Sequence, residues 1–345
     1  MNNLELTASI EKAALACGFD TCGIVRLEEM QGYTDALKDR IAHFPDSEPM
    51  FGRFTRFVDP AQLPSWAKSV VVCSYWYGKY RIPENLQGII GKAFCLDIRR
   101  DKQSEGYQIV ECFEKALTEL GVQHAAEHDY GITAMRWAAV KAGIGIVRKN
   151  NFFYTRQGSW NWLAVFLIDR DLELKKVPAI KSCPEKCGLC VKACPTQALD
   201  KPFYTNGVAC VGFLTGKATC APGKKHYDKC GKWIYGCDAC QDACPYNRGA
   251  WDAVEEFHGL EELSRSISYE KILGMDDGAL REMLSQKFWY IEPERVWTWK
   301  CNILNAMHNN YEGKYLPHIE AAMQDPQKEV REMAQWVFES VSVMA

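Results

Sequence analysis

Two cysteine runs decide the fold of this chain: Cys183-Pro-Glu-Lys-Cys187-Gly-Leu-Cys190-Val-Lys-Ala-Cys194-Pro195 and, further on, Cys237-Asp-Ala-Cys240-Gln-Asp-Ala-Cys244-Pro245. Closely spaced cysteines that end in Cys-Pro, twice in one chain, are typical of a protein that binds two 4Fe–4S clusters. In such segments the first three cysteines of a run bind one cluster, and the cysteine before proline binds the other. The proline then ends the loop, because it has no N–H to continue the local hydrogen bonding.

The second run has only two cysteines ahead of its Cys-Pro, so its cluster lacks one ligand. Three further cysteines, Cys210, Cys220 and Cys230, lie between the runs, and we expect one of them to fill the gap. A pair of structural zinc sites is the alternative, since zinc also binds four cysteines with two-residue spacers. The Cys-Pro ending favours iron–sulfur clusters, because zinc sites do not require it.

The composition is that of an ordinary soluble globular protein, with 345 residues, of which 47% are hydrophobic and 25% charged. This length allows two or three domains with cores of their own. The net charge of −3 gives no overall attraction to nucleic acid. The longest apolar run in the middle of the chain, residues 162–168, is far shorter than the ~20 residues of a membrane helix. We therefore expect a cytoplasmic protein with no membrane segment.

We expect no export signal ahead of the 16 cysteines, because residues 1–5 have neither a basic nor an apolar region. This combination predicts a reducing compartment and metal ligation, not a disulfide framework. We expect free, buried thiols at the cysteines outside the central segment: Cys17, Cys22, Cys73, Cys95 and Cys112.

Ahead of the cysteine runs, helical and strand patterns alternate. Apolar residues recur at helical spacing in residues 4–17, 108–120 and 134–142. Apolar, β-branched and aromatic residues indicate strands at residues 23–25, 69–77 and 160–168. The charged residues 169–182 are expected to be a linker, and everything after residue 260 has a helical pattern. We expect an α/β domain, a ferredoxin-type double-cluster domain and a helical region with a HEAT-like helix pair, at residues 1–178, 179–255 and 256–345.

Of three other motifs, the first argues against dinucleotide binding and the other two leave their function open. Gly143-Ile-Gly145 is an incomplete dinucleotide fingerprint, because the third glycine is missing and the motif follows a helix. Asp129 precedes the predicted helix at residues 134–142, where an acid is either an N-cap or a catalytic proton donor. The basic loop at residues 217–232 either contacts phosphates or is simply a solvated loop.

Several stretches of the chain resemble the epoxyqueuosine reductase (QueG) family, cobalamin-dependent enzymes related to reductive dehalogenases. They are Ala209-Cys210-Val-Gly-Phe-Leu-Thr215, Ile234-Tyr-Gly-Cys-Asp-Ala-Cys-Gln-Asp-Ala-Cys-Pro-Tyr-Asn247, Ala142-Gly-Ile-Gly-Ile-Val-Arg-Lys-Asn150, Gly158-Ser-Trp160, and Cys301-Asn302 with the Asp325-Pro326 helix pair. The first cysteine run has a three-residue spacer where the family has two, and the segment after Asp129 departs from the family pattern. Such departures also fit a paralogue with an altered substrate.

The resemblance implies a nitroreductase-like α/β domain that binds cobalamin with its lower base off. It implies one cluster on Cys183, Cys187, Cys190 and Cys244, and the other on Cys194, Cys210, Cys237 and Cys240. It implies a cobalamin pocket that includes Arg136, Gly143, Gly145, Lys149, Asn150 and Ser159. Asp129 matches the family's proton donor, a role for which we expect a raised pKa in a water-poor pocket.

By this resemblance the protein is expected to be a monomeric reductase that converts epoxyqueuosine to queuosine in tRNA. Electrons would come from a ferredoxin or flavodoxin, and the loop at residues 217–232 with the helical tail would contact the RNA. Two alternatives remain at this point. One is a cobalamin-dependent reductase of another, small-molecule substrate, and the other is an electron-transfer or corrinoid-reactivating iron–sulfur protein.

Overall fold

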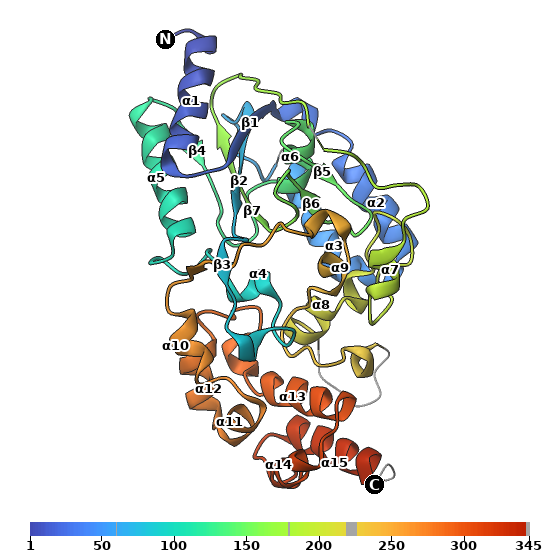
Figure 1. The fold of residues 1–345 in the computed structure, drawn as a ribbon. Coiled ribbons are helices and arrows are strands. Elements are labelled where there is room, and N and C mark those ends of the chain that lie inside the picture. The colour runs from blue at the N-terminus through green and yellow to red at the C-terminus, as the bar shows by residue number, and fades with distance from the viewer. Residues whose placement is uncertain (60, 179, 219–225, 343–345) are drawn as a thin grey trace.

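The computed structural model describes residues 1–59, 61–178, 180–218 and 226–342. Figure 1 shows an N-terminal part built around a sheet, a middle part of short helices and loops, and a C-terminal part of helices. The N-terminal helices are α1 (Asn3–Cys17), α2 (Tyr33–His43), α3 (Glu48–Phe51), α4 (Lys92–Cys95), α5 (Glu105–Glu119) and α6 (Met135–Lys141). The strands are β1 (Thr21–Arg26), β2 (Ser69–Trp76), β3 (Tyr80–Arg81), β4 (His124–Ala125), β5 (Ile146–Val147), β6 (Phe153–Tyr154), β7 (Asn161–Ile168) and β8 (Glu255–Glu256). The predicted mixture of helices and strands is confirmed.

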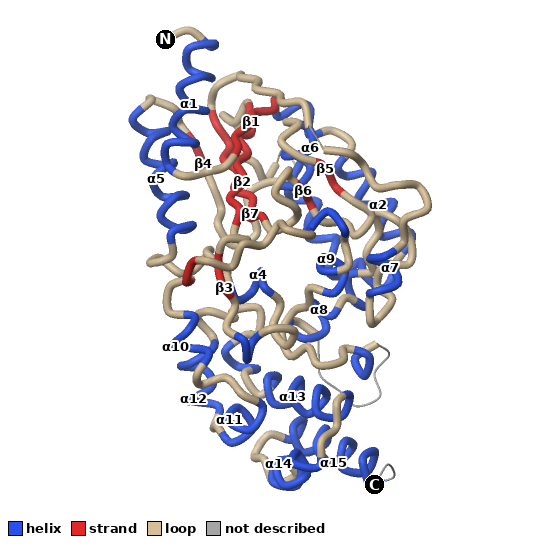
Figure 2. Tube along the Cα trace, in the orientation of Figure 1, coloured by secondary structure: helices blue, strands red, loops and turns tan. Residues whose placement is uncertain are grey.

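β2 and β7 form the centre of an antiparallel sheet with the strand order β1-β2-β7-β4. Val72 of β2 lies between Gly23 and Val165 of the two neighbouring strands. Val71 packs into the core under α1 and α5, while Val72 packs with α6 on the opposite face. Figures 1 and 2 show these helices on the two sides of the sheet. Both faces of β2 are therefore buried, as its β-branched and aromatic composition predicts.

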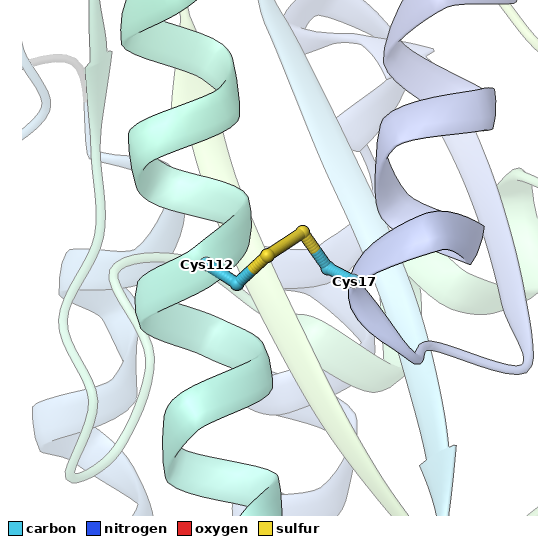
Figure 3. The surroundings of a disulfide bond; sticks show 2 residues. All are labelled: Cys17 and Cys112. Atoms are coloured by element: carbon cyan, nitrogen blue, oxygen red, sulfur yellow. A yellow bond between two sulfur atoms is a disulfide. The ribbon is translucent and has the colours of Figure 1, made fainter.

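A disulfide joins α1 to α5, between Cys17 and Cys112, whose Cα atoms are 5.8 Å apart (Figure 3). The expectation of free thiols is wrong for these two cysteines. The reason is tertiary, because they are separated by 95 residues and meet only where the two helices pack side by side. The expectation is confirmed for Cys22, Cys73 and Cys95, which are buried and free.

Part of the expected linker belongs to the sheet. Leu174 exchanges two backbone hydrogen bonds of 2.9 Å with Ile24 of β1. The next contact follows at once, since the N–H of Lys176 donates to the carbonyl of Ala142. Residues around Leu174 thus extend the sheet at its β1 edge, although their charged composition indicates a connecting segment.

The cysteine segment contains three short helices, α7 (Leu189–Ala193), α8 (Val211–Gly216) and α9 (Ala239–Asp242), joined by loops. It interlocks with the N-terminal part through two parallel strand contacts. One is the pair formed by β3 and β8, and the other joins Ile90 to Tyr235. The segment after β2 therefore holds the cysteine loops against the N-terminal part built around the sheet, which we call the sheet domain.

The C-terminal part consists of α10 (Leu260–Ser264), α11 (Tyr269–Gly274), α12 (Asp277–Leu284), α13 (Thr298–Asn309), α14 (Leu316–Ala322) and α15 (Lys328–Ser342). The two helices predicted around the break at Asp325-Pro326 are confirmed as α14 and α15. Helix α13 is buried on nearly every side, and the side-chain amide of Asn302 donates to two carbonyls of the cysteine segment. Within the described ranges, no helix combines the length and apolarity needed to cross a membrane.

Candidate functional site

The first run of cysteines surrounds a cavity of about 160 Å³. Its lining includes Cys183, Cys187 and Cys190 from the first run and Cys244 from the second. Burial raises the pKa of the Cys190 thiol, and the negative charges of Cys183, Cys244 and Cys187 raise it further. Three cysteines of one run and the Cys-Pro cysteine of the other are thus neighbours, which is the crossed arrangement of double-cluster proteins.

The remaining four cysteines of the predicted ligand sets form a second group. Burial raises the pKa of the Cys240 thiol well above its ordinary value. The negative charges of Cys210, Cys237 and Cys194 raise this pKa further. The charge of Cys190, which belongs to the first group, also raises the pKa of the Cys240 thiol, so the two groups lie next to each other. Cys220 lies outside the described residues. Nowhere in the described ranges are three or more His, Cys, Asp or Glu side chains grouped closely enough to hold a single metal ion.

Two cations next to the sheet domain hold the loop of the first group. The ammonium of Lys149 donates to the carbonyls of Pro184, Glu185 and Cys187 at 2.9, 2.6 and 3.0 Å. Arg148 is buried, and its Nη1 lies 3.8 Å from the sulfur of Cys183. Positive charge beside a thiol stabilises the thiolate, which is the form that binds metal.

Asn150 and Ser159 contact the second run instead. The amide of Asn150 donates to the carbonyl of Cys240 at 3.2 Å. The hydroxyl of Ser159 donates to Gln241 at 2.8 Å, and the side chain of Asn247 donates back to that hydroxyl at 2.9 Å. Of the residues expected around a cofactor, Lys149 and Asn150 therefore brace the cysteine loops, while Ser159 does this and also lines a cavity of the sheet domain.

Two adjoining cavities are lined mainly by the sheet domain, and the larger one also by Phe203, Tyr204 and Tyr290 from later parts of the chain. The sheet cavity, about 220 Å³, is bounded by β7, α5 and the loop before Asp129, and includes Tyr75 and Trp162. The α2–α6 cavity, about 670 Å³, lies between α2, α6 and the segment at residues 51–57. Arg99, Met135 and Arg136 line both cavities, so the two spaces adjoin.

The two glycines of the predicted pocket have packing roles. At Gly145 a Cβ atom would come within 2.3 Å of the Phe153 ring, where β5 pairs with β6. Gly143 has φ +71°, and a Cβ atom there would lie 1.8 Å from the carbonyl oxygen of Lys176. The close backbone approach that the sequence predicts is present, but neither glycine lines the sheet cavity or the α2–α6 cavity.

Asp129 is held by an arginine fork. Both of its carboxylate oxygens accept hydrogen bonds from Arg100, at 2.6 and 3.1 Å. These bonds hold the pKa of Asp129 below its ordinary value. The expectation of a raised pKa in a water-poor pocket is therefore wrong for this arrangement, in which the carboxylate is partly exposed and ion-paired.

Behind Asp129 lies a stack of cations and aromatic rings that the sequence analysis missed. Arg99 forms an ion pair with Asp97 at 2.5 Å and donates to the backbone carbonyl of Asp129 at 2.7 Å. Its guanidinium lies 4.8 and 4.7 Å from the ring centres of Trp162 and Trp289. The Arg-Arg pair after Asp97 is visible in the sequence, but no local pattern connects it to rings so far along the chain.

Comparisons with known proteins agree with this arrangement. The family model of the 4Fe-4S double cluster binding domain matches residues 182–247. The epoxyqueuosine reductase of Cyclobacterium marinum is 31% identical over 260 residues, which cover 72% of this chain and 82% of that protein. The enzyme of the same name from Bacillus subtilis is 27% identical over 361 residues, or 97% of this chain and 88% of the relative.

Solved structures share the fold. The crystal structure of an epoxyqueuosine reductase with an epoxyqueuosine-modified tRNA-Tyr stem loop superposes with a TM-score of 0.80 at 24% identity, over 99% of this chain and 91% of that one. A structure of the Bacillus subtilis enzyme, with its catalytic aspartate loop swung out of the active site, matches with the same TM-score, identity and coverage. The extent of the sequence match to the Cyclobacterium relative, together with the double-cluster segment, shows that this chain belongs to the epoxyqueuosine reductase family.

Proposed function

We propose that this protein reduces epoxyqueuosine to queuosine in tRNA, using two 4Fe–4S clusters and cobalamin. The observation that carries the proposal is the crossed arrangement of the cysteines next to a large aromatic cavity, in a chain of this family. Neighbouring residues connect the two parts, because Asn150 donates to the carbonyl of Cys240 and Asn151 lines the α2–α6 cavity.

The proposed cluster ligands follow the two groups of neighbouring thiols. One cluster would be held by Cys183, Cys187, Cys190 and Cys244, and the other by Cys194, Cys210, Cys237 and Cys240. The mutual charge effects among the members of each group support this division. Arg148 and Lys149 would stabilise the first cluster, one by its charge beside the sulfur of Cys183 and the other by fixing the loop.

The sheet domain, a nitroreductase-like fold in this proposal, is suited to base-off cobalamin. The α2–α6 cavity falls within the roughly 300–1,000 Å³ of cavities that bind small molecules, and the sheet cavity adjoins it. Aromatic side chains and three arginines dominate its walls, which fits a large apolar ring carrying polar groups at its edge. When bound, cobalamin supplies a cobalt centre that takes up electrons and acts as a strong reductant or nucleophile.

Asp129 would supply the proton. In the structure its carboxylate is bound to Arg100 and lines neither cavity. Delivery of a proton therefore requires the loop around Asp129 to leave Arg100 and turn towards the cavity, where a lower polarity raises the pKa of a carboxyl group. The relative whose aspartate loop is swung out of its active site is consistent with such a movement.

An acidic ferredoxin or flavodoxin would dock beside the first cysteine group. Leu189 and Tyr246 line its cavity and are 44% and 37% exposed. Near these residues in the chain are four exposed cations, Lys181, Lys186, Lys192 and Arg248, which we define as the basic rim. Only Glu185 opposes them between Lys181 and Lys192, so the rim is basic in a chain of net charge −3. Reversal of charge at Lys186 and Lys192 should slow reduction by ferredoxin and leave reduction by dithionite unchanged.

The RNA-binding part of the proposal concerns the predicted basic loop and the helical, HEAT-like tail. Lys217 forms an ion pair with Glu292, whereas Lys229 and Lys232 are exposed. Residues 219–225 of this loop lie outside the described residues. Phosphate contacts of this kind weaken as salt rises, so binding of a tRNA stem loop should fall with ionic strength.

Anaerobic reconstitution with iron, sulfide and cobalamin tests the proposed function. We expect about eight irons and one base-off cobalamin per chain, and turnover of an epoxyqueuosine-containing stem loop. Asp129→Asn should abolish turnover and keep the cobalamin spectrum, because the amide fills the same space without an acidic proton. Full activity of this variant would remove Asp129 from the mechanism, and zinc in place of iron would refute the proposed function.

A further inference from the structure

Two arginines face each other in the α2–α6 cavity without an acidic partner. Arg40 comes from α2 and donates to the side-chain oxygen of Asn151 at 3.4 Å, and Arg136 comes from α6 and donates to the backbone carbonyl of the same residue. Among the described residues, neither guanidinium forms an ion pair with a carboxylate. No carboxylate contributes to the pKa shift of either arginine. Their donors are thus satisfied only in part.

The position of Arg136 makes this arrangement unusual. The side chain is surrounded by protein, yet it is exposed to the space of the cavity. Enclosure lowers the pKa of Arg136 to about 10, and the positive charge of Arg40 lowers it further. Arg99, which is more enclosed and lines the same cavity, has the carboxylate of Asp97 at 2.5 Å. Elsewhere in this cavity, therefore, the fold supplies the anion that an enclosed guanidinium needs.

The surroundings define what kind of anion fits. Asp39 is an acid in the described lining, and its carboxylate accepts a hydrogen bond from the hydroxyl of Tyr204. The ring of Phe51 packs 5.3 Å from the guanidinium of Arg40, and further aromatic side chains extend the wall. At about 670 Å³ the cavity has room for much more than a free phosphate ion. An anion attached to a flat, apolar group matches both features.

We propose that Arg40 and Arg136 together bind a phosphodiester, namely the phosphate in the nucleotide tail of base-off cobalamin. Guanidinium groups suit this role because their planar donors bind two phosphate oxygens at once. The aromatic wall beside them would receive the base of the tail. This assignment rests on the proposed function, and it gives Arg40, which no motif singles out, a role in cofactor binding.

Cobinamide, which keeps the corrin ring and lacks the nucleotide tail, provides the test. The full-length protein with its clusters is titrated anaerobically with cobalamin and with cobinamide, and binding is followed by the corrinoid absorbance. We expect Arg40→Gln and Arg136→Gln each to weaken cobalamin binding by about 10- to 100-fold, the range for a lost hydrogen bond to a charged group. Cobinamide binding should change by less than about twofold, because no phosphate is present to lose its partner.

Three controls define the outcome. Arg156→Gln removes an exposed arginine outside the α2–α6 cavity and should leave both affinities unchanged. Inorganic phosphate should compete with cobalamin, and much less with cobinamide, in the unmodified protein. Arg40→Lys should restore part of the cobalamin affinity, because it returns the charge without the planar fork.

The alternatives give different results. An equal loss of cobalamin and cobinamide affinity in Arg40→Gln and Arg136→Gln would mean that these arginines contact the corrin ring, and would overturn the assignment. Unchanged cobalamin affinity with weaker binding of a tRNA stem loop would transfer the site to an RNA phosphate, with the same consequence. If the unmodified protein bound neither corrinoid, the proposed function itself would fail, which is a distinct and recognisable result.

Discussion

The fork between Arg100 and Asp129 yields a quantitative prediction for Arg100→Gln. The two hydrogen bonds measure 2.6 and 3.1 Å, but the side chains are 46% and 31% exposed, so solvent screens the pair. A pair of this kind contributes about 1 kcal/mol at most, which corresponds to roughly 0.7 pKa unit. Loss of the fork should raise the pKa of Asp129 by up to this amount and make departure of its loop about fivefold more favourable.

The assay is the pH dependence of turnover with reconstituted enzyme. A carboxylic acid that donates a proton acts in its protonated form, so its contribution falls as pH rises through its pKa. In Arg100→Gln the alkaline limb should move upwards by up to about 0.7 unit, and turnover near neutral pH should rise. Arg56→Gln is the matched control. Arg56 forms an ion pair at 3.7 Å with Glu127, which lies in the same loop as Asp129, but Arg56 does not bind Asp129 itself.

A downward or absent shift of the alkaline limb in Arg100→Gln, with a normal cobalamin spectrum, would refute this reasoning. Folding stability depends on pH in the opposite sense to turnover. The pKa of Asp129 is lowered in the folded state, so the fork stabilises the fold above the ordinary aspartate pKa, and this contribution is lost as pH falls through the lowered pKa. Thermal unfolding between neutral and acid pH should therefore show a smaller acid-induced loss in Arg100→Gln than in the unmodified protein.

Three further predictions concern the scaffold. Cys210→Ala should retain about four of eight irons, measured by iron content and spectrum; retention of all eight would assign the missing ligand elsewhere. Lys300→Met should lower the free energy of unfolding by about 3–5 kcal/mol, because Asp325, 2.7 Å from Lys300 and almost fully buried, would lose its partner; the exposed pair formed by Lys328 with Glu332 is the control, and an equal effect there would contradict the reasoning. Cys17→Ser should destabilise the protein by roughly 2–4 kcal/mol through loss of the disulfide, and a reductant should have this effect only on the unmodified protein; an identical response of the variant would exclude a stabilising bond to Cys112.

The cysteine runs were readable from the sequence because cluster ligation is largely local. A few residues between cysteines turn the backbone around one volume, so spacing alone predicts the kind of site. The strongest helices and strands were also predictable, as α1, α5, β2 and β7 show, because hydrophobic periodicity is a property of consecutive residues. The resemblance in residues 209–215 and 234–247 added the family, which the comparisons confirm.

What only the tertiary structure decided are the relations between residues distant in the chain. Asp129 meets Arg100 across 29 positions, and this contact, not its place before a helix, lowers its pKa. Arg40 and Arg136 approach each other because α2 and α6 border one cavity, and their lack of an acidic partner cannot be seen in either segment. The sequence by itself determined the cysteine sites and the main elements, because short-range spacing governs both. The fold decided the direction in which the pKa values of Asp129 and Arg136 are shifted, because burial and neighbouring charges depend on the packing of the whole chain.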